Sequence, residues 1–204
     1  MQLWENGPYW AECNVGASKP EEYGYYFWWG DTVGYKHDGE GWNAVDGSRN
    51  GFSFDEDNCQ TYGKEISELR ASGYINSNGN LVAAHDAATA HLGAPWRMPT
   101  GAEWKALNDN CDTVWTERNG VRGRLVKGKG VYSSKSIFLP AAGIGGGSRL
   151  DSDGSYGLYW SSMRYSGNSY GAWRICFNSG CFSRNNYKDR YYGQSVRPIR
   201  VFTK

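Results

Sequence analysis

Cys176 and Cys181, near the C-terminus, are the residues whose type and spacing come closest to a metal-binding pair. Soft thiolates select Cu(I), so the pair would suit copper if both sulfurs pointed to one place. The two cysteines flank an expected hairpin turn at residues 178–180, however, and this argues against a shared metal. The sequence contains neither a C-x-x-C motif nor a Cys/His cluster with zinc spacing.

The remaining cysteines and the histidines also predict no metal or cofactor. The five cysteines are an odd number, which excludes a fully paired disulfide framework. One disulfide or none stays open among Cys13, Cys59 and Cys111. The three histidines are scattered, and we interpret them as surface or capping residues: His37, His85 and His91.

Acidic and glycine-rich segments have simpler explanations than catalysis. Residues 55–57 and 151–153 hold pairs of aspartates that could bind calcium loosely, but solvated loop carboxylates are favoured. The glycine-rich loop 143–147 lacks the following helix with Lys-Ser/Thr of a phosphate-binding loop. No serine lies in a nucleophile elbow or beside a suitable histidine. We therefore expect no enzymatic activity.

Thr100 and Glu103 give the clearest local signal, a capping box at the start of a helix. The Thr100 hydroxyl can accept from the Glu103 N–H while the Glu103 carboxylate accepts from the Thr100 N–H. The helix is expected to run to about Cys111, with Trp104 and Leu107 facing inward. Glu103 is thus predicted to be a cap and not a catalytic acid.

Composition limits the function classes. The 204 residues include 28 Gly, 16% aromatic and 21% charged residues, which indicates a packed core with many turns. A net charge of +1 without a basic run does not favour nucleic acid binding. No stretch approaches the ~20 apolar residues of a membrane span. Residues 1–5 lack signal-peptide features, so export by that route is not expected unless the chain is trimmed.

The remaining elements are expected to be short. Residues 9–17 predict a strand and a turn, 23–30 a buried aromatic strand or loop, and 31–60 a long ordered loop. Helices are expected at 64–71 and 85–92, with a turn at 76–80. Short strands and turns are expected from Asn119 onward, including a strand at 136–140. A closing strand is expected at 194–201, where Pro198 indicates an edge or a bulge.

The segment 156–195 differs in composition from the rest of the chain. It contains seven Tyr, seven Ser, five Gly, four Asn and four Arg. Antibody paratopes have this character, since Tyr supplies contact area at low entropic cost while Ser, Asn and Gly supply adaptable hydrogen bonds. Trp173, Ile175 and Phe177 alternate with polar residues, which predicts a hairpin with one apolar and one mixed face. Trp173 is assigned to the core together with Trp96, Trp104 and Trp160.

Several motifs, in order along almost the whole chain, resemble the Fibrobacter-type major paralogous domain. They are residues 11–17 (AECNVGA), 86–89 (DAAT), 96–100 (WRMPT), 138–143 (FLPAAG), 159–162 (YWSS) and 193–198 (GQSVRP). That domain is common in Bacteroidetes and their phages. The C-terminal part resembles the variable proteins of diversity-generating retroelements.

The resemblance implies an α+β, C-type-lectin-like fold. Short helices would surround small antiparallel sheets with many ordered loops, and the N- and C-terminal strands would pair. It implies one domain over residues 1–204, with 31–85 as an insertion or loop region and 159–198 as the variable ligand-binding segment.

In such systems template adenines are replaced at random, so one Asn codon yields residues such as Asn, Tyr, Ser, Asp, Arg, Cys and Ala. On this view Cys176 and Cys181 are chance products of diversification. Met163 and Lys188 fit the codon rule less simply, and Tyr191 could belong to the scaffold. The implied ligand-binding residues are Met163, Arg164, Tyr165, Asn168, Tyr170, Ala172, Arg174, Cys176, Asn178, Cys181, Ser183, Asn185, Tyr187, Lys188, Asp189 and Tyr191.

The partner implied is a protein or glycan receptor on a cell surface, with no nucleic acid and no membrane insertion. The chain would belong to a larger protein on a virion or a bacterial cell surface. One alternative is a copper oxidase of the formylglycine-generating type. Residues 96–104 (WRMPTGAEW) resemble a signature of that family, although its C-terminal motif is absent here. Others are a calcium-dependent lectin, whose sugar-binding motifs are also absent, and a non-diversified structural module.

Overall fold

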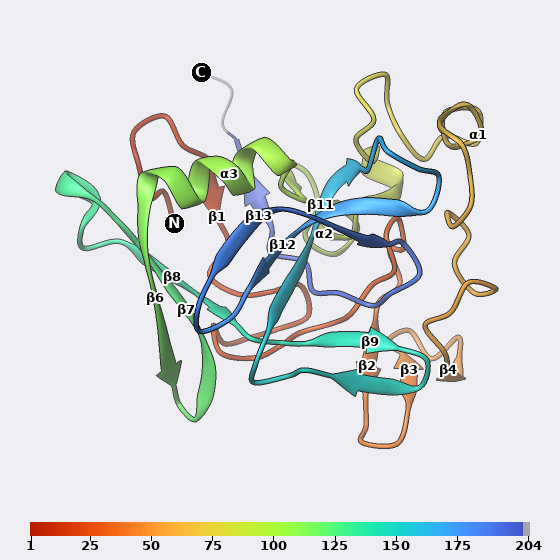
Figure 1. Cartoon of the computed structure of the whole chain (residues 1–204), viewed down its shortest axis with the longest axis horizontal. Coiled ribbons are helices and arrows are strands. Elements are labelled where there is room, and N and C mark those ends of the chain that lie inside the picture. Colours follow the sequence, from red (N-terminus) through yellow and green to blue (C-terminus); the bar gives the residue numbers. More distant parts are fainter. Residues whose placement is uncertain (202–204) are drawn as a thin grey trace.

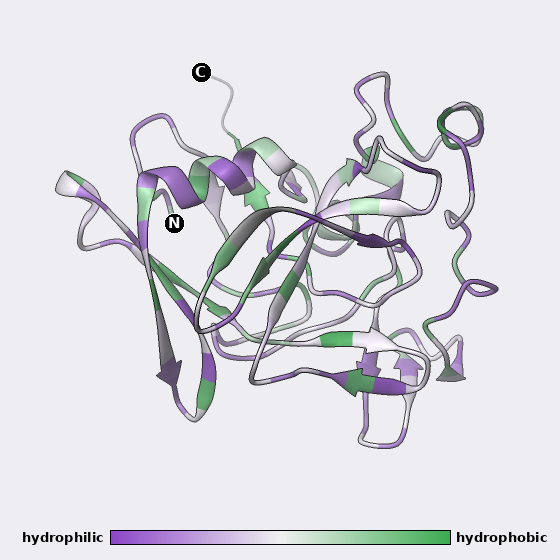
Figure 2. Cartoon of the chain, viewed as in Figure 1, coloured by the Kyte–Doolittle hydropathy of each residue, from purple (hydrophilic) through white to green (hydrophobic). Residues whose placement is uncertain are grey.

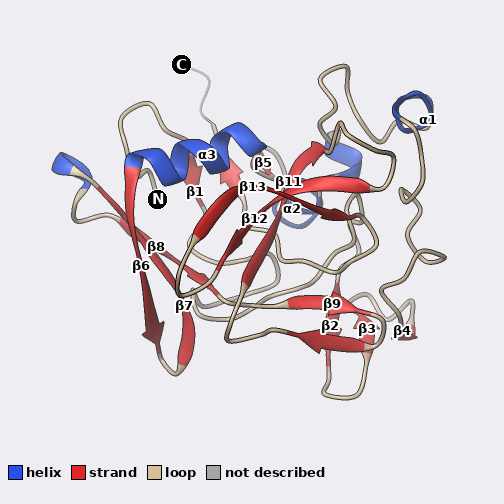
Figure 3. Cartoon of the chain, viewed as in Figure 1, coloured by secondary structure: helices blue, strands red, loops and turns tan. Residues whose placement is uncertain are grey.

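The computed structural model describes residues 1–201, apart from the side chains of residues 183–185. The fold is α+β: small antiparallel sheets dominate, and the helices are few and short (Figures 1 and 3). No helix in this part of the chain is both long enough and apolar enough to cross a bilayer.

A three-stranded sheet joins the two ends of the chain. Strand β14 (Ile199–Arg200) lies between β1 (Tyr9–Trp10) and β5 (Trp96–Arg97), antiparallel to both. The expected pairing of the N- and C-terminal strands is therefore confirmed.

Four further sheets complete the β-structure of the described residues. One is formed by β2 (Tyr35–His37), β3 (Trp42–Ala44) and β4 (Asn50–Phe52). A second is formed by β6 (Cys111–Arg118), β7 (Val121–Gly128) and β8 (Ser136–Pro140). The hairpin of β9 (Ile144–Gly146) and β10 (Arg149–Asp151) follows, and then the sheet of β11 (Gly157–Arg164), β12 (Gly171–Phe177) and β13 (Phe182–Asp189).

The helices lie around these sheets. They are α1 (Ile66–Ala71), α2 (Ala87–Leu92) and α3 (Gly101–Asn110), with single 3₁₀ turns at Ala83–His85 and Gly130–Tyr132. Helix α3 carries hydrophobic and hydrophilic bands in alternation (Figure 2), and it buries Trp104 and Leu107 as predicted. The capping box of Thr100 and Glu103 is confirmed, with the Thr100 N–H donating to the carboxylate at 2.8 Å.

Aromatic side chains fill the interior in three buried clusters. Trp29 and Trp160 lie in one, Trp10 and Trp104 in a second, and Trp42 in the third. All five are at most 1% exposed. Because a buried aromatic removes roughly 150–250 Å² from water, these rings stabilise a fold in which many strands have only two or three residues.

Two expectations were wrong. Residues 31–60 are not only a loop, since they contain the sheet β2–β3–β4; strands of three residues are too short to show a period of two. The strand series begins with β6 at Cys111 and not at Asn119. Asn119 and Gly120, both with positive φ, instead form the turn between β6 and β7. Asn-Gly is the dipeptide that two-residue hairpin turns favour, so this turn was detectable.

Arg197 holds the ends of the chain to the second sheet although it is fully buried. Its guanidinium donates to the Asn14 Oδ1 at 2.9 Å and to the carbonyl oxygens of Ala11 at 3.0 Å, Glu12 at 2.6 Å and Phe138 at 2.8 Å. A buried charge is tolerated only when its donors are used, and here one side chain joins the C-terminal segment to two distant ones, residues 11–14 and Phe138.

Replacing Arg197 with Met should lower the free energy of unfolding by about 3 kcal/mol or more, because several buried acceptors lose their donor at once. Urea unfolding followed by circular dichroism measures this. Arg149→Met is the matched control, since the Arg149 side chain is 80% exposed. Equal urea midpoints for the two variants would refute the role given to Arg197.

Candidate ligand-binding surface

The sheet β11–β12–β13 carries most of the residues expected to bind ligand, and β13 is its edge strand. The strands are antiparallel, and their register shifts at two places. One is on β11 between Trp160 and Arg164, and the other is on β13, opposite the residues from Arg174 to Cys176 of β12. Such bulges bend a strand and redirect its side chains. An edge strand with bulges can present side chains on both of its faces.

The inner framework of this sheet is partly as predicted. Ile175 and Phe177 are fully buried and pack with Tyr159 and Trp104. Trp173 is only half-buried, so its assignment to the core is wrong; Trp96 is half-buried as well. The register explains Trp173, because it pairs with Tyr187, which is 44% exposed.

Ala172 was expected to point outward, and this is wrong. The residue is fully buried and packs in the same cluster as Trp29 and Trp160. Ala172 lies on the same face of β12 as Arg174, whose partner Trp160 is buried in the same cluster, so the core covers this face at Ala172. Ala172 therefore does not belong to an exposed surface.

The other expected residues lie on two faces of the hairpin and not on one. Trp173 pairs with Tyr187, and the next residue, Arg174, pairs with Asn186. Neighbouring residues of a strand point to opposite faces, so these two pairs lie on opposite sides of the sheet. The expectation of a single mixed outer face is corrected accordingly.

Three aromatic rings gather on one side, and we call them the aromatic cluster: Tyr165, Trp173 and Tyr187. The rings of Tyr165 and Tyr187 stack with centroids 3.9 Å apart and an interplanar angle of 1°. Trp173 meets Tyr165 edge-on at 5.0 Å. The cluster is ordered by its own contacts while it remains partly exposed, as an interface anchor needs to be.

The opposite side of the hairpin is more polar and more enclosed. Arg174 Nε donates to Asn186 Oδ1 at 2.8 Å, and burial lowers the pKa of Arg174. The Lys188 ammonium lies 4.0 Å from the centroid of the Tyr192 ring. Cys176 is half-buried beside this group, and burial raises the pKa of its thiol.

Two of the expected asparagines are used to shape turns. The Asn168 side-chain oxygen accepts from the N–H groups of Tyr170 at 3.0 Å and Gly171 at 2.8 Å. The Asn178 side-chain oxygen accepts from Gly180 at 2.8 Å and Cys181 at 3.0 Å. These amides order the loops that present Tyr170, which is 46% exposed, and Cys181.

The remaining expected residues are placed as follows. Met163, Arg164, Asp189 and Tyr191 are half-buried at the rim of the sheet. The backbone of Ser183 pairs with Cys176, and Asn185 lies on the same strand. The side chains of Ser183 and Asn185 lie outside the described residues.

Sequence reasoning missed Arg190, which joins the surface to the rest of the chain. Arg190 is 1% exposed, and its guanidinium donates to the carbonyl oxygens of Gly171 at 3.0 Å, Thr61 at 2.8 Å and Lys64 at 3.2 Å. It also lies over the Trp29 ring at 5.2 Å, and burial lowers its pKa to about 10. No sequence motif marks this role, because the partners are backbone carbonyls.

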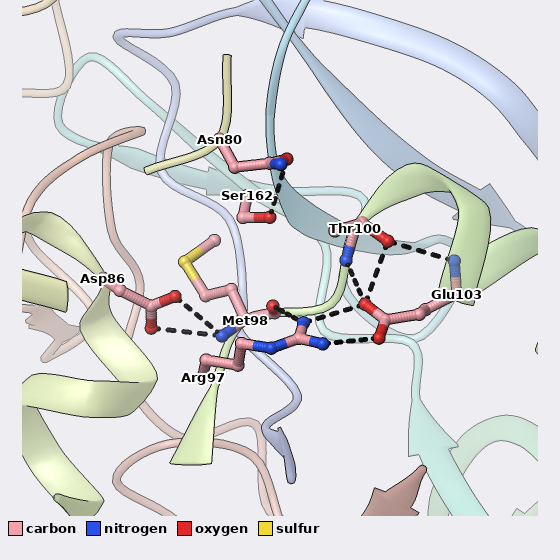
Figure 4. Close-up of polar contacts among 7 residues, drawn as sticks. All are labelled: Asn80, Asp86, Arg97, Met98, Thr100, Glu103 and Ser162. Atoms are coloured by element: carbon pink, nitrogen blue, oxygen red, sulfur yellow. Dashed lines mark hydrogen bonds and ion pairs between the residues drawn. The ribbon is translucent and has the colours of Figure 1, made fainter. Parts of the chain in front are cut away.

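A second network of hydrogen bonds supports β11. Figure 4 shows Asp86, Arg97 and Glu103 converging on the segment from Met98 to Thr100. Asp86 accepts from the Met98 N–H at 2.8 Å, and Arg97 meets the Glu103 carboxylate with bonds of 2.6 and 2.8 Å.

Burial alone would raise the pKa of Glu103, but the bonds from Arg97 and Thr100 outweigh it, and the pKa lies below its usual value. The Pro99 carbonyl in turn accepts from the Ser162 N–H at 2.8 Å, which connects this network to β11. The Glu103 carboxylate therefore has a structural role, since its hydrogen bonds hold Arg97 and the start of α3.

All five cysteines are described, and no two of them are bonded to each other in the structure. Within residues 1–201, no group of three or more His, Cys, Asp or Glu side chains is placed to hold a metal ion. Comparison of the chain with protein-family models, curated proteins and solved structures finds no match.

The cysteines should differ sharply in reactivity with a disulfide reagent at pH 8, because the thiolate is the reacting form. Cys181 is exposed and should be labelled first. Cys59 and Cys111 are at most 5% exposed and burial raises their pKa, to about 11 for Cys111, so they should react only in urea. Peptide mass spectrometry identifies the labelled residues, and rapid labelling of native Cys59 would contradict the structure.

Replacing Arg190 with Met should release residues 59–65 from the sheet, since Thr61 and Lys64 lose their donor. Hydrogen exchange should become faster in residues 59–65 and at Gly171, with a smaller change elsewhere. Arg122→Met, an exposed residue on β7, is the control. Wild-type exchange rates at residues 59–65 in the Arg190 variant would rule out this role.

Proposed function

We propose that the chain is a non-enzymatic receptor-binding domain with a C-type-lectin-like fold. It binds a protein or glycan on a cell surface through the residues around β11–β13. The observation that carries the proposal is the aromatic cluster of Tyr165, Trp173 and Tyr187, which is partly exposed on a rigid sheet.

The chemistry of this surface supports recognition. Tyr165, Tyr170 and Tyr187 provide large, stiff contact areas, and Asn186 and Lys188 provide polar groups on the other side of the hairpin. Tyr, Trp and Arg dominate the binding energy of typical interfaces, which bury roughly 800 Å² per partner. Such a surface needs no catalytic group to function.

The fold proposal rests on two features. The ends of the chain pair through β1 and β14, and most of the chain consists of short antiparallel strands and ordered loops. Both agree with the family that the motifs at residues 96–100 and 193–198 resemble. A copper oxidase is not favoured, because Cys176 is half-buried and Cys181 is exposed on the far side of the hairpin turn.

Diversification is the second part of the proposal. The residues that we propose to vary are the exposed or half-buried members of the expected set that shape neither turns nor core. Ala172 is excluded because it is buried. Display on a virion or a bacterial cell surface, within a larger protein, would give the multivalency that raises weak binding to useful avidity.

The Tyr165→Ala/Tyr170→Ala/Tyr187→Ala variant should lose at least tenfold in binding to intact bacterial cells, because interface anchors each contribute ~1 kcal/mol or more. A panel of bacterial strains is incubated with the fluorescent chain and measured by flow cytometry. Thermal unfolding confirms that the variant is folded.

The matched control is Val114→Ala/Val131→Ala. It removes two apolar side chains, 55% and 93% exposed, from β6 and from the turn Gly130–Tyr132 that precedes β8. The proposal requires wild-type binding from this control. Equal binding by the two variants would place recognition elsewhere.

For diversification, the neighbouring DNA should contain a near-identical repeat that differs only at adenines, next to a reverse transcriptase gene.

A further inference from the structure

A small pocket of about 160 Å³ lies between the aromatic cluster and the segment around α1. Arg70 and Asn78 line it from one side, and Arg164, Ser166 and Trp173 line it from the other. The first two residues belong to the 31–85 region, which the sequence marked only as an insertion. Part of this region therefore shares a pocket with the candidate ligand-binding surface.

The two walls are bonded to each other. The Arg164 N–H donates to the Gly79 carbonyl at 3.2 Å, and the Leu81 N–H donates to the Ser162 carbonyl at 2.9 Å. Met163 forms a β-bridge with Asn80. Figure 1 shows the loop before α2 beside the upper end of β11. The pocket is therefore a fixed part of the fold.

The turn that forms the outer wall is ordered by Asn76. Its side-chain oxygen accepts from the N–H groups of Asn78 at 2.9 Å and Asn80 at 3.2 Å. Gly79 adopts a positive φ of 79°, and a Cβ there would lie 3.5 Å from Arg164 Nε. A preorganised wall lowers the entropic cost of binding.

Two arginines line this pocket, and no carboxylate of a described residue accompanies them. Arg70 Nη2 donates to the Ser77 carbonyl at 2.7 Å, and Arg164 Nη1 donates to the Tyr165 carbonyl at 3.0 Å. The ion pairs found among the described residues involve neither arginine, and no described residue lining the pocket is acidic. The nearby Glu68 carboxylate accepts from the Glu65 N–H at 2.8 Å.

The chemistry of the walls selects the ligand. A guanidinium presents a planar fork of donors that matches a carboxylate. Trp173 and Met163 supply apolar surface, and Asn78 and Ser166 can exchange hydrogen bonds with hydroxyl groups. Pockets for drug-sized ligands enclose ~300–1,000 Å³, so this one suits a single sugar unit.

We infer that this pocket binds the carboxylate-bearing unit of an acidic saccharide, with Arg70 and Arg164 holding the carboxylate and Trp173 lying beside the sugar ring. The inference rests on the proposed function, because it assigns a ligand class to one part of the same surface. It adds Arg70 and the 76–80 turn to the residues that recognise the ligand.

The test uses trigalacturonate as the probe, with its methyl ester as the uncharged counterpart. Binding to the whole chain is followed by NMR of the indole N–H signals, with Trp173→Phe to assign the signal of Trp173. We expect trigalacturonate to shift the signal of Trp173 when it binds. Its affinity should be at least tenfold higher than that of the methyl ester. The affinity should fall in 0.5 M salt, because salt screens contacts between exposed charges.

Arg70→Met and Arg164→Met should each weaken trigalacturonate binding about tenfold or more, because each removes charge-assisted hydrogen bonds. Arg122→Met removes an exposed arginine from β7 and should bind as the wild type does. Thermal unfolding checks that all variants are folded. Equal losses in all three variants would reveal a general charge effect and overturn the assignment.

The outcomes separate this inference from the proposed function. Binding to cells that depends on the three tyrosines, without binding of trigalacturonate, would refute the pocket assignment and leave the proposed function intact. Equal binding of triglutamate would show a general carboxylate site and overturn the saccharide assignment. Trigalacturonate binding that needs Arg70 and Arg164, with cell binding indifferent to the tyrosines, would support the pocket and refute the aromatic cluster.

Discussion

The burial of Arg190 is the constraint on which the candidate surface depends. A guanidinium that is 1% exposed has to keep its donors satisfied, and it does so with carbonyls of Gly171, Thr61 and Lys64. These carbonyls belong to the start of β12 and to the segment before α1. One side chain thereby holds the end of the hairpin, the 59–65 segment and the core at Trp29 together. Arg197 joins the chain ends in the same way.

This arrangement separates what must stay constant from what can change. Ile175, Phe177 and Tyr159 pack in the core, and backbone hydrogen bonds hold the strands in register whatever side chains they carry. Tyr187 on β13 is 44% exposed, so the residue at this position can differ in size without creating a buried cavity. A surface of this kind would tolerate the diversification that we propose.

The ligand surface that we propose has a fixed part and a changeable part. The fixed part is the turn around Asn76 and helix α1, which are bonded to β11 through Gly79 and Leu81. The changeable part consists of Tyr165, Tyr170 and Tyr187 with the polar residues around them. A pocket whose outer wall is constant, beside anchors that change, would let one class of chemical group be bound while the surrounding contacts select among its carriers.

The sequence alone determined the local elements, because capping and turn preferences act over a few residues. Thr100 and Glu103 predicted the start of α3, residues 64–71 predicted a helix, and the turn at 178–180 was correct. Tertiary structure decided the burial of Ala172 and Trp173, because core clusters cover parts of both faces of the sheet: Ala172 packs with Trp160, whereas Trp173 lies beside the exposed Tyr187. It also decided that Arg70 and Arg164 line one pocket and that Arg190 holds distant carbonyls, because these depend on groups brought together from distant parts of the chain.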